Sequence, residues 1–372
     1  MGKYCEMQNR KQNIPAIVLC VFWLALSVAS WLHSPQDISL EERRKLAQRP
    51  EAELASIVRG TFMTGFEEYA KDQFPGRFGL RKMKALLRTK VLGHADSNGI
   101  YVLDNYAAKL EYPLNESSVE KAMLKFRYVY DTYLQGTDSN IYASVIPDKN
   151  YYLGSRRGYP SIDYDQMFRL VRDGMPYAEY IDIADSLTIE DFYRSDIHWR
   201  QENLHAVVRK LSDAIGFDAA FNAFERRETG MTFLGVYAGQ SALSLLADPI
   251  VLLASSATDN SAAYDVETGT FTPVYNMERL VDRDPYDVYL SGAAPIVIVD
   301  NPEAALEREL ILFRDSFASS LAPLLLHGYS RITLIDIRYI RSDMLSDYIT
   351  FKDQDVLFLY NALLLNASNV LK

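Results

Sequence analysis

Cysteine is almost absent from this sequence of 372 residues, and the two cysteines that occur lie near its start. Cys5 falls in a short polar tail and Cys20 in an apolar run, so the chain after residue 32 contains no thiol. That part can form no disulfide, no cysteine-ligated zinc site and no cysteine nucleophile. Its core must hold by packing alone, which several hundred residues can supply.

Positive charge is also scarce, because the formal net charge at pH 7 is −10. The first 32 residues carry a net +2, which leaves −12 on the rest of the chain. An acidic surface does not attract phosphate backbones, so the composition argues against a nucleic-acid partner. The sequence also lacks a P-loop and a GxGxxG stretch, which removes the main support for nucleotide binding. We expect no cofactor and no metal site.

The longest apolar run extends from residue 14 to residue 32 and contains no charged side chain. As a helix it matches a bilayer core of about 30 Å. Three cations precede this run and no basic residue follows it until Arg43, so we expect a single-pass membrane anchor with a cytoplasmic N-terminus and an extracytoplasmic domain. A cleaved signal peptide is the alternative, because Ser27 and Ala29 are small residues at cleavage-like spacing.

Composition divides the chain into four segments: a cytoplasmic tail at 1–13, the transmembrane anchor at 14–32, a juxtamembrane helical segment at 33–95 and an α/β domain at 96–372. The juxtamembrane segment opens with an acid–base cluster, LEERRKLAQRPEAE, which predicts a solvated helix or stalk. Aromatic residues and charges follow, and a proline–glycine pair divides two predicted short helices.

In the predicted α/β domain, short apolar runs of β-strand character alternate with helical patterns. This alternation predicts a mainly parallel sheet that is flanked by helices. Ligands of such sheets bind outside the carboxyl ends of the strands. The helical patterns cover 116–135, 161–174, 200–215 and 316–327, and the predicted strands are 99–103, 140–146, 179–183, 249–253, 296–300, 310–313, 331–337 and 355–359.

Ser316 stands where an apolar strand runs directly into a predicted helix, in the stretch ILFRDSFASSLAPLLLHG. A serine in this position is held out of the sheet, and its own backbone N–H lies at a helix start where it can meet a developing oxyanion. Serine is also a preferred helix cap, and the segment alone favours that plainer interpretation. A catalytic serine needs a base, and the base needs a group that fixes its tautomer.

His198 is the best candidate for that base among the five histidines. It lies in the polar and aromatic stretch DFYRSDIHWR, between a predicted strand and a predicted helix. Asp196 is two residues away, so in an extended segment both side chains leave the same face. A carboxylate beside an imidazole fixes the Nδ1–H tautomer and stabilises the imidazolium. The alternative is an ordinary loop in which Asp196 caps the next helix and Trp199 anchors the core.

The segment Ser195 to Trp199, with its Asp-x-His-Trp pattern, resembles the signature of the DHHW family, and Arg314-Asp315-Ser316-Phe317 resembles that family's nucleophile block. The order, with Asp-x-His before the serine, is similar to that of AlgX/AlgJ-type polysaccharide O-acetyltransferases, which are related to SGNH hydrolases. Most of the chain after the anchor shares the resemblance, including RPEAELASIVRG at 49–60, DQFPGR at 72–77, VIPDKNYY at 145–152, TFLGVYAG at 232–239 and LIDIRY at 334–339.

The resemblance implies an SGNH-like fold in which Ser316 is the nucleophile, His198 the general acid and base, and Asp196 the orienting carboxylate. It implies an O-acetyltransferase that acts on an exported polysaccharide, with a multi-pass membrane-bound acyltransferase of the MBOAT type as the acyl donor. Four further residues are secondary candidates for substrate binding. Two are cations that follow predicted strands and two are aromatic residues that could stack on sugar rings: Lys149, Arg338, Trp199 and Tyr237.

Two other functions fit the same residues. A carbohydrate O-acetylesterase would form the same acyl-enzyme and resolve it with water. A catalytically idle scaffold that binds glycan in an exopolysaccharide secretion complex would use the triad positions only as loop anchors. Ala293 and Arg314 favour the scaffold, since an SGNH hydrolase would carry asparagine and glycine at the corresponding positions.

Overall fold

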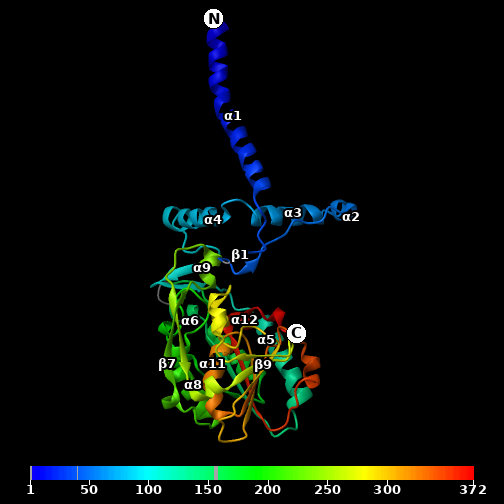
Figure 1. Cartoon of the computed structure of the whole chain (residues 1–372), viewed down its shortest axis with the longest axis vertical. Coiled ribbons are helices and arrows are strands. Elements are labelled where there is room, and N and C mark those ends of the chain that lie inside the picture. The colour runs from blue at the N-terminus through cyan, green and yellow to red at the C-terminus, as the bar shows by residue number, and fades with distance from the viewer. Residues whose placement is uncertain (1, 40, 155–157) are drawn as a thin grey trace. The chain divides into compact units, whose positions relative to one another are not determined.

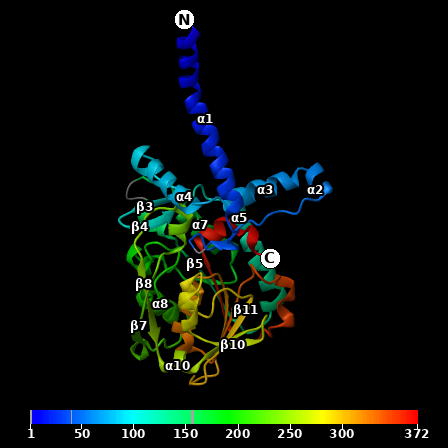
Figure 2. The same cartoon turned by 45° about the horizontal axis from the view of Figure 1, so that its top comes forward.

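The structure, a computed structural model, describes residues 2–39, 41–154 and 158–372. It divides the chain into two compact units, residues 1–93 and residues 94–372. Figures 1 and 2 show both units, with the N-terminal unit in blue and cyan.

The N-terminal unit begins with one long helix, α1 (Gly2–Leu32). Its segment Ile14–Leu32 is long and apolar enough to cross a membrane, and none of that segment is buried inside the protein. An apolar helix with no protein packed around it matches the predicted anchor segment by length and composition.

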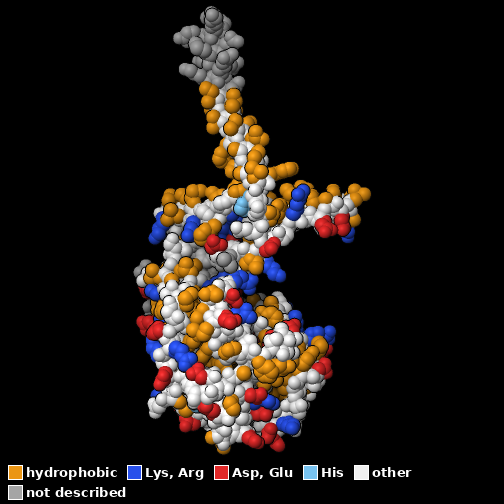
Figure 3. Space-filling view, viewed as in Figure 1, with side chains coloured by type: hydrophobic (Ala, Val, Ile, Leu, Met, Phe, Trp, Pro, Cys, Tyr) orange, Lys and Arg blue, Asp and Glu red, His pale blue; other side chains and the backbone are white. Residues whose placement is uncertain are grey.

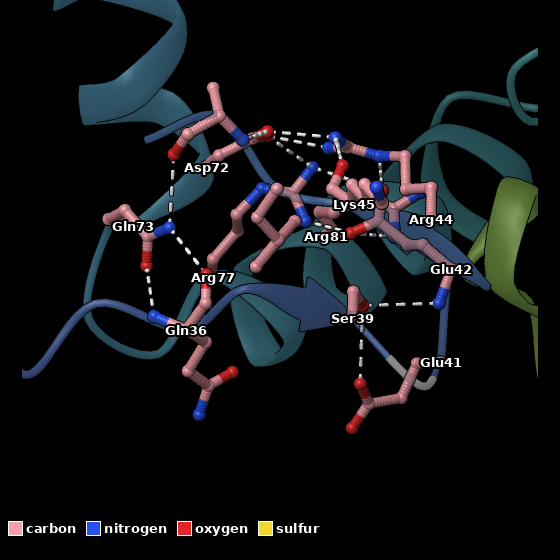
Figure 4. A network of polar contacts seen from close by, with 12 residues as sticks. Gln36, Ser39, Glu41, Glu42, Arg44, Lys45, Asp72, Gln73, Arg77 and Arg81 are labelled. Carbon is pink, nitrogen blue, oxygen red and sulfur yellow. Dashed lines mark hydrogen bonds and ion pairs between the residues drawn. The ribbon is translucent and has the colours of Figure 1, made fainter. Parts of the chain in front are cut away.

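The rest of this unit contains three α-helices and a π-helical turn: α2 (Leu54–Val58), α3 (Thr61–Asp72), α4 (Arg77–Leu86) and η1 (Leu87–Val91). Before them the chain is not the helical stalk that its charge pattern predicts. It forms the two-residue strands β1 (Ile38–Ser39) and β2 (Arg44–Lys45), which pair in antiparallel fashion. Pro35 and Pro50 bound this stretch, and charged side chains within it contact α3 and α4 (Figure 4).

The C-terminal unit is built on an eight-stranded mixed sheet with the strand order β10-β9-β11-β13-β12-β14-β5-β6. Neighbours from β13 to β6 are parallel, whereas the pairs from β10 to β13 are antiparallel. The predicted α/β class with a mainly parallel sheet is thus confirmed. The strands are β5 (Asn140–Ile146), β6 (Glu179–Tyr180), β9 (Ala262–Asp265), β10 (Thr270–Pro273), β11 (Ile296–Asp300), β12 (Glu309–Arg314), β13 (Arg331–Ile335) and β14 (Asp355–Asn361).

Helices cover both faces of this sheet, because successive strand residues point to opposite faces and both faces are apolar. On one face, α5 (Glu116–Val129), α7 (Tyr164–Gly174) and α12 (Ala362–Asn366) pack on side chains such as Ile311 and Phe358. On the other face, α8 (His205–Ile215) and α11 (Ala318–Leu325) pack on Leu312 and Leu357. The helical patterns predicted from the sequence all contain helix, and the core has three layers (Figures 1 and 2).

Two of the eight predicted strands belong to other sheets. The first, β3 (Ile100–Leu103), pairs with β4 (Tyr106–Lys109), and the second, β8 (Asp248–Ala254), pairs with β7 (Glu225–Phe233). Apolar runs identify strands, but they carry no information about which partner each strand meets. The sequence interpretation also missed β4, β7, β9 and β10, which are short or largely exposed on the outer positions.

Candidate active site

Ser316 lies at the carboxyl end of the sheet, in the short turn between β12 and α11. Strand β12 lies between the parallel neighbours β13 and β14, and the apolar start of α11 is buried directly after the turn. The turn therefore holds Ser316 at the edge of the core, where its side chain keeps partial contact with solvent. Across the described parts of the chain, no acceptor is found for the backbone N–H of Ser316, which leaves that donor free at the start of α11.

His198 reaches Ser316 from a segment 118 residues earlier in the chain, and the distance from His198 Nε2 to Ser316 Oγ is 2.8 Å. His198 Nδ1 lies 2.6 Å from Asp196 Oδ1. An ionised carboxylate can only accept hydrogen bonds, so Nδ1 carries the proton of the neutral ring. Nε2 of that tautomer is then the acceptor, and the Ser316 hydroxyl donates to it. The three side chains form a relay from a buried carboxylate to a partly exposed hydroxyl.

The Asp196 carboxylate is buried and held by backbone donors as well as by the imidazole. Oδ1 accepts from His198 N at 3.1 Å, and Oδ2 accepts from Val236 N at 2.8 Å. Gly235 makes this approach possible, because a Cβ on that residue would lie 2.2 Å from Asp196 Cα. The start of helix α9 (Val236–Ser241) thus packs directly on the Asp196 backbone and sets the carboxylate's orientation.

Asp315 is a second buried carboxylate next to the nucleophile position, but it bonds to the backbone. Its Oδ1 accepts from Phe317 N at 3.0 Å, and its Oδ2 accepts from Asn361 N at 2.7 Å. Burial raises the pKa of Asp315, while the nearby Arg338 and these two N–H donors oppose that rise. Asp315 therefore ties the turn that carries Ser316 to the end of β14.

An aromatic ring supports the imidazole from one side. The ring of Tyr286 is stacked on His198 with centroids 3.8 Å apart and an interplanar angle of 7°. Tyr286 is buried, and its hydroxyl donates to Ser320 Oγ at 2.8 Å. The next residue, Asp287, is largely buried close to Asp284, and burial raises its pKa to about 6. Stacking against an immobile ring restricts the rotation of the imidazole.

Three of the four secondary candidates for substrate binding lie in the protein interior, and the sugar-contact prediction is wrong for both aromatic residues. Trp199 is fully buried, and its Nε1 donates to Phe317 O and Ser320 Oγ, both at 3.0 Å. Tyr237 is buried as well, so neither ring has a face that a sugar can reach. Burial of such large rings contributes strongly to packing, and the indole N–H has its acceptors inside the protein.

Lys149 is also buried, which rules out direct contact with a glycan in this structure. Its ammonium donates to the carbonyl oxygens of Tyr193 at 2.9 Å and Arg194 at 3.2 Å, and it lies 4.9 Å from the ring centre of Tyr237. Burial lowers the pKa of Lys149 to about 7, against the opposing field of Asp196 and other acids. Lys149 therefore supports the backbone just before Asp196.

Arg338 lies at the predicted edge, directly after β13, and is partly exposed. Its guanidinium binds Asp336 through two hydrogen bonds of 2.9 and 2.6 Å. A guanidinium engaged in this fork has few donors left for a ligand. Its sugar-binding role stays a prediction. Across the described residues, no group of three or more His, Cys, Asp or Glu side chains is placed to hold a metal ion.

Comparison with known proteins relates the fold to solved structures. No protein-family model matches the sequence, and no curated protein matches it. A DHHW family protein from Eubacterium siraeum DSM 15702 superposes with a TM-score of 0.57 at 16% identity, covering 74% of this chain and 94% of that one. The chain has the fold of that DHHW protein. The recognition made from the sequence motifs is confirmed at the level of structural likeness.

Two further structures are similar. Bacillus cereus PatB1 gives a TM-score of 0.59 at 18% identity, covering 72% of this chain and 96% of PatB1; PatB1 has also been solved with a sulfonyl adduct. The O-acetyltransferase domain of Pseudomonas putida AlgJ gives a TM-score of 0.44 at 15% identity, covering 72% of this chain and 92% of that domain. At such identities the likeness to the DHHW protein and PatB1 establishes the fold alone.

Sequence reasoning missed the residues that hold the three central side chains in place. Gly235 and Val236 stand in TFLGVYAG, a stretch that carries part of the family resemblance, but nothing in its pattern placed it against Asp196. Tyr286 and Asp287 stand in an acidic loop with no periodic pattern. Only the tertiary structure brings these loops to the carboxyl end of the sheet.

Proposed function

We propose that this protein is a serine-dependent O-acyltransferase, most simply an O-acetyltransferase, that acts on hydroxyl groups of an exported or cell-surface polysaccharide. The observation that supports it best is the hydrogen-bonded series Asp196–His198–Ser316, with distances of 2.6 and 2.8 Å. A carboxylate, an imidazole and a hydroxyl in this order are the parts that nucleophilic acyl transfer requires. The fold shared with the DHHW protein and PatB1 supports the same assignment.

In the first half-reaction, Ser316 Oγ attacks the acyl carbonyl while its proton passes to His198 Nε2. The imidazolium is stabilised by Asp196. The free N–H of Ser316, at the start of α11, is placed to donate to the developing oxyanion. The donor's oxygen leaves with the proton from His198, and an acyl ester on Ser316 remains.

In the second half-reaction, a glycan hydroxyl gives its proton to His198 Nε2 and attacks the acyl ester. The tetrahedral intermediate collapses, the acyl group stays on the glycan, and Ser316 recovers the proton from His198. An O-acetylesterase would use water in place of the glycan. Because both reactions share the acyl-enzyme, the acceptor alone separates them.

The first experiment measures release of p-nitrophenol from p-nitrophenyl acetate by the wild type, Ser316→Ala and the matched control Ser117→Ala, which removes an exposed hydroxyl from the start of α5. We expect Ser316→Ala to lower turnover by about 10⁴-fold, since loss of a triad serine removes covalent catalysis. The control should retain full activity. A sulfonyl fluoride should label the wild type at Ser316, detected by mass spectrometry, and not the Ser316→Ala protein.

Equal turnover of the wild type and Ser316→Ala, with neither labelled, would favour the idle scaffold instead. Arg314 is the feature that points in that direction, because an SGNH hydrolase would carry glycine at the corresponding position. Adding oligosaccharides to the active protein then separates the two enzymes. Acyl-oligosaccharide in the products indicates a transferase, and acetate alone indicates an esterase.

The topology belongs to the same proposal. We take α1 as an uncleaved anchor that leaves the C-terminal unit outside the cytoplasmic membrane, with a multi-pass MBOAT-type protein as the source of the acyl group. The three cations before Ile14 support this orientation. Intact mass of the membrane-extracted protein tests it, because a cleaved signal peptide would remove the first 29 residues or so.

A further inference from the structure

The juxtamembrane helices α3 and α4, with η1, bear apolar side chains on their outside. In α3, Met63 is 62% exposed and Phe66 is 41% exposed. In α4, Leu80 and Met83 are 45% and 53% exposed, and Leu87 of η1 follows on the same side. Residues three or four apart share one helix face, so the named side chains form an exposed apolar stripe on each helix, of two residues on α3 and three on α4 with η1. Figure 3 shows apolar side chains gathered along this part of the molecule.

Some charged side chains of the same helices form a polar cluster with the β1–β2 segment. Asp72 of α3 receives two hydrogen bonds from Arg44, at 2.5 and 2.7 Å, and Arg77 and Arg81 of α4 pair with Glu42 (Figure 4). The hydrogen bonds from Arg44 lower the pKa of Asp72, so this carboxylate is ionised at neutral pH. The unit thus largely buries the carboxylates of Glu42 and Asp72 and leaves large apolar side chains of α3 and α4 exposed.

A short tether connects this cluster to the anchor helix. Gln73, at the end of α3, donates through Nε2 to Gln36 O at 2.8 Å, and Gln73 Oε1 accepts from Gln36 N at 2.9 Å. Gln36 is four residues beyond Leu32, the end of α1. Four residues span at most about 14 Å. The end of α3 therefore lies within about 14 Å of chain length from the point where α1 ends.

The charge of α4 and η1 also fits a lipid surface. From Arg77 to Leu92 the chain has six cations and no acid. Three of these cations, Lys82, Lys84 and Lys90, are exposed, and Lys82 lies over the Phe78 ring at 4.4 Å. A basic helix with an exposed apolar stripe is typical of segments that lie in the interface of a membrane with anionic lipids.

We propose that α3, α4 and η1 form a membrane-interfacial platform: their exposed apolar stripes insert into the headgroup boundary of the bilayer that α1 enters, and the lysines of α4 and η1 bind anionic lipid headgroups. The occupant of the exposed stripe is lipid. The proposal does not rest on the chemistry of Ser316.

The first test measures the depth of one labelled position in the full chain. Cys5→Ser and Cys20→Ala remove the native thiols, and Met83→Cys then carries a bimane label in vesicles of phosphatidylcholine and phosphatidylglycerol. We expect quenching by lipids that carry a spin label near the headgroup, and protection from iodide in the water. Leu124→Cys, an equally apolar and exposed position on α5, is the matched control and should show the reverse pattern.

Either of two results would overturn the proposal. Quenching of the Met83 label by iodide would place the stripe in water. Protection from both quenchers would mean that protein covers it, either the rest of this chain or a partner in the membrane. Only quenching from the lipid side supports an interfacial platform.

The second test uses the chain from His33 onward, because none of Ile14–Leu32 is buried and its removal takes away no packing. Cosedimentation with the same vesicles compares two triple variants that lose the same charge. The test variant is Lys82→Gln, Lys84→Gln, Lys90→Gln. The control variant is Lys121→Gln, Lys125→Gln, Lys352→Gln, whose lysines are exposed on the C-terminal unit. We expect the first triple to lose about 100-fold in vesicle affinity, since each cation near an anionic surface contributes about fivefold. Equal binding by both triples would refute the lipid-binding role of the lysines. A thermal melt monitors folding of each variant.

Discussion

The two units of this chain distribute polarity in opposite ways. In the C-terminal unit, the apolar residues of both sheet faces are covered by helices, and the buried carboxylates are each held by defined donors. In the N-terminal unit, the carboxylates of Glu42 and Asp72 lie among arginines in the interior while large apolar side chains lie outside. The first arrangement is suited to water on every side. The second leaves apolar area in contact with solvent, and such exposed area marks a surface that contacts a membrane or another molecule.

The largest effect in this comparison should come from Asp196→Asn in the C-terminal unit. The amide keeps the shape of the carboxylate but can no longer fix the tautomer or stabilise the imidazolium, so turnover of p-nitrophenyl acetate should fall by about 10³- to 10⁴-fold. The exposed Glu190→Gln is the control and should leave turnover unchanged. A loss below tenfold would contradict the role assigned to the carboxylate.

A pair of glycine substitutions sharpens the contrast between the units. Gly235→Ala puts a Cβ 2.2 Å from Asp196 Cα, so the loop must move, and we expect about 2–4 kcal/mol of lost stability together with lower turnover. Gly79→Ala in α4 meets no atom within 4 Å and should stabilise its helix by up to about 1 kcal/mol. Thermal unfolding of both variants measures these changes in stability. An unchanged stability of Gly235→Ala would show that the close contact between Gly235 and Asp196 is not needed.

Removing the charge at the centre of the N-terminal cluster should have an intermediate effect. Asp72→Asn leaves Arg44 and Arg77 facing a neutral partner, and we expect about 1–3 kcal/mol of lost stability in this unit. Limited proteolysis of α3 and α4 reports the loss locally. Turnover per folded molecule should not change, because the cluster contributes no side chain to the site at Ser316. Full resistance to protease in Asp72→Asn would argue that the ion pairs are dispensable.

The last prediction concerns pH and the buried Lys149, whose effect is small for each pH unit. Its folded pKa is about 7, below the 10.5 of an exposed lysine, so between these values the unfolded chain binds more protons than the folded chain. Stability from this residue therefore rises with pH from about 7 to about 10.5, by at most about 1.4 kcal/mol per pH unit. Lys149→Met should remove that slope in urea unfolding curves collected between pH 7 and 10. If stability rises with pH just as steeply in Lys149→Met, a group other than Lys149 causes the pH dependence.

Local patterns were sufficient to predict the α/β class and the segments that form the sheet, because an apolar run of five to seven residues stays a strand wherever it pairs. They could not assign β3 and β8 to separate sheets, since pairing is decided by the partner's position. The same limit applies to the stalk: its charges predict solvation, but Arg44 and Glu42 are used in ion pairs with α3 and α4.

In the candidate site, too, local patterns identified some residues, while the roles of others depend on the tertiary structure. Ser316, His198 and Asp196 could be proposed from sequence because a strand-to-helix serine and an Asp-x-His pair are local patterns. Trp199 and Tyr237 were assigned to sugar stacking, yet both are core residues. From the sequence alone, an aromatic side chain beside a reactive residue could either face a ligand or support the loop. Only its burial in the structure distinguishes these two roles.

The indole of Trp199 provides a second hydrogen-bonded link between the two segments that carry His198 and Ser316. It follows His198 in the chain and bonds to the carbonyl of Phe317, which follows Ser316, so two parallel links join the same two segments. A displacement of the turn before α11 relative to the loop that bears His198 must therefore stretch both hydrogen bonds. The two hydrogen bonds together restrain the distance between His198 Nε2 and Ser316 Oγ.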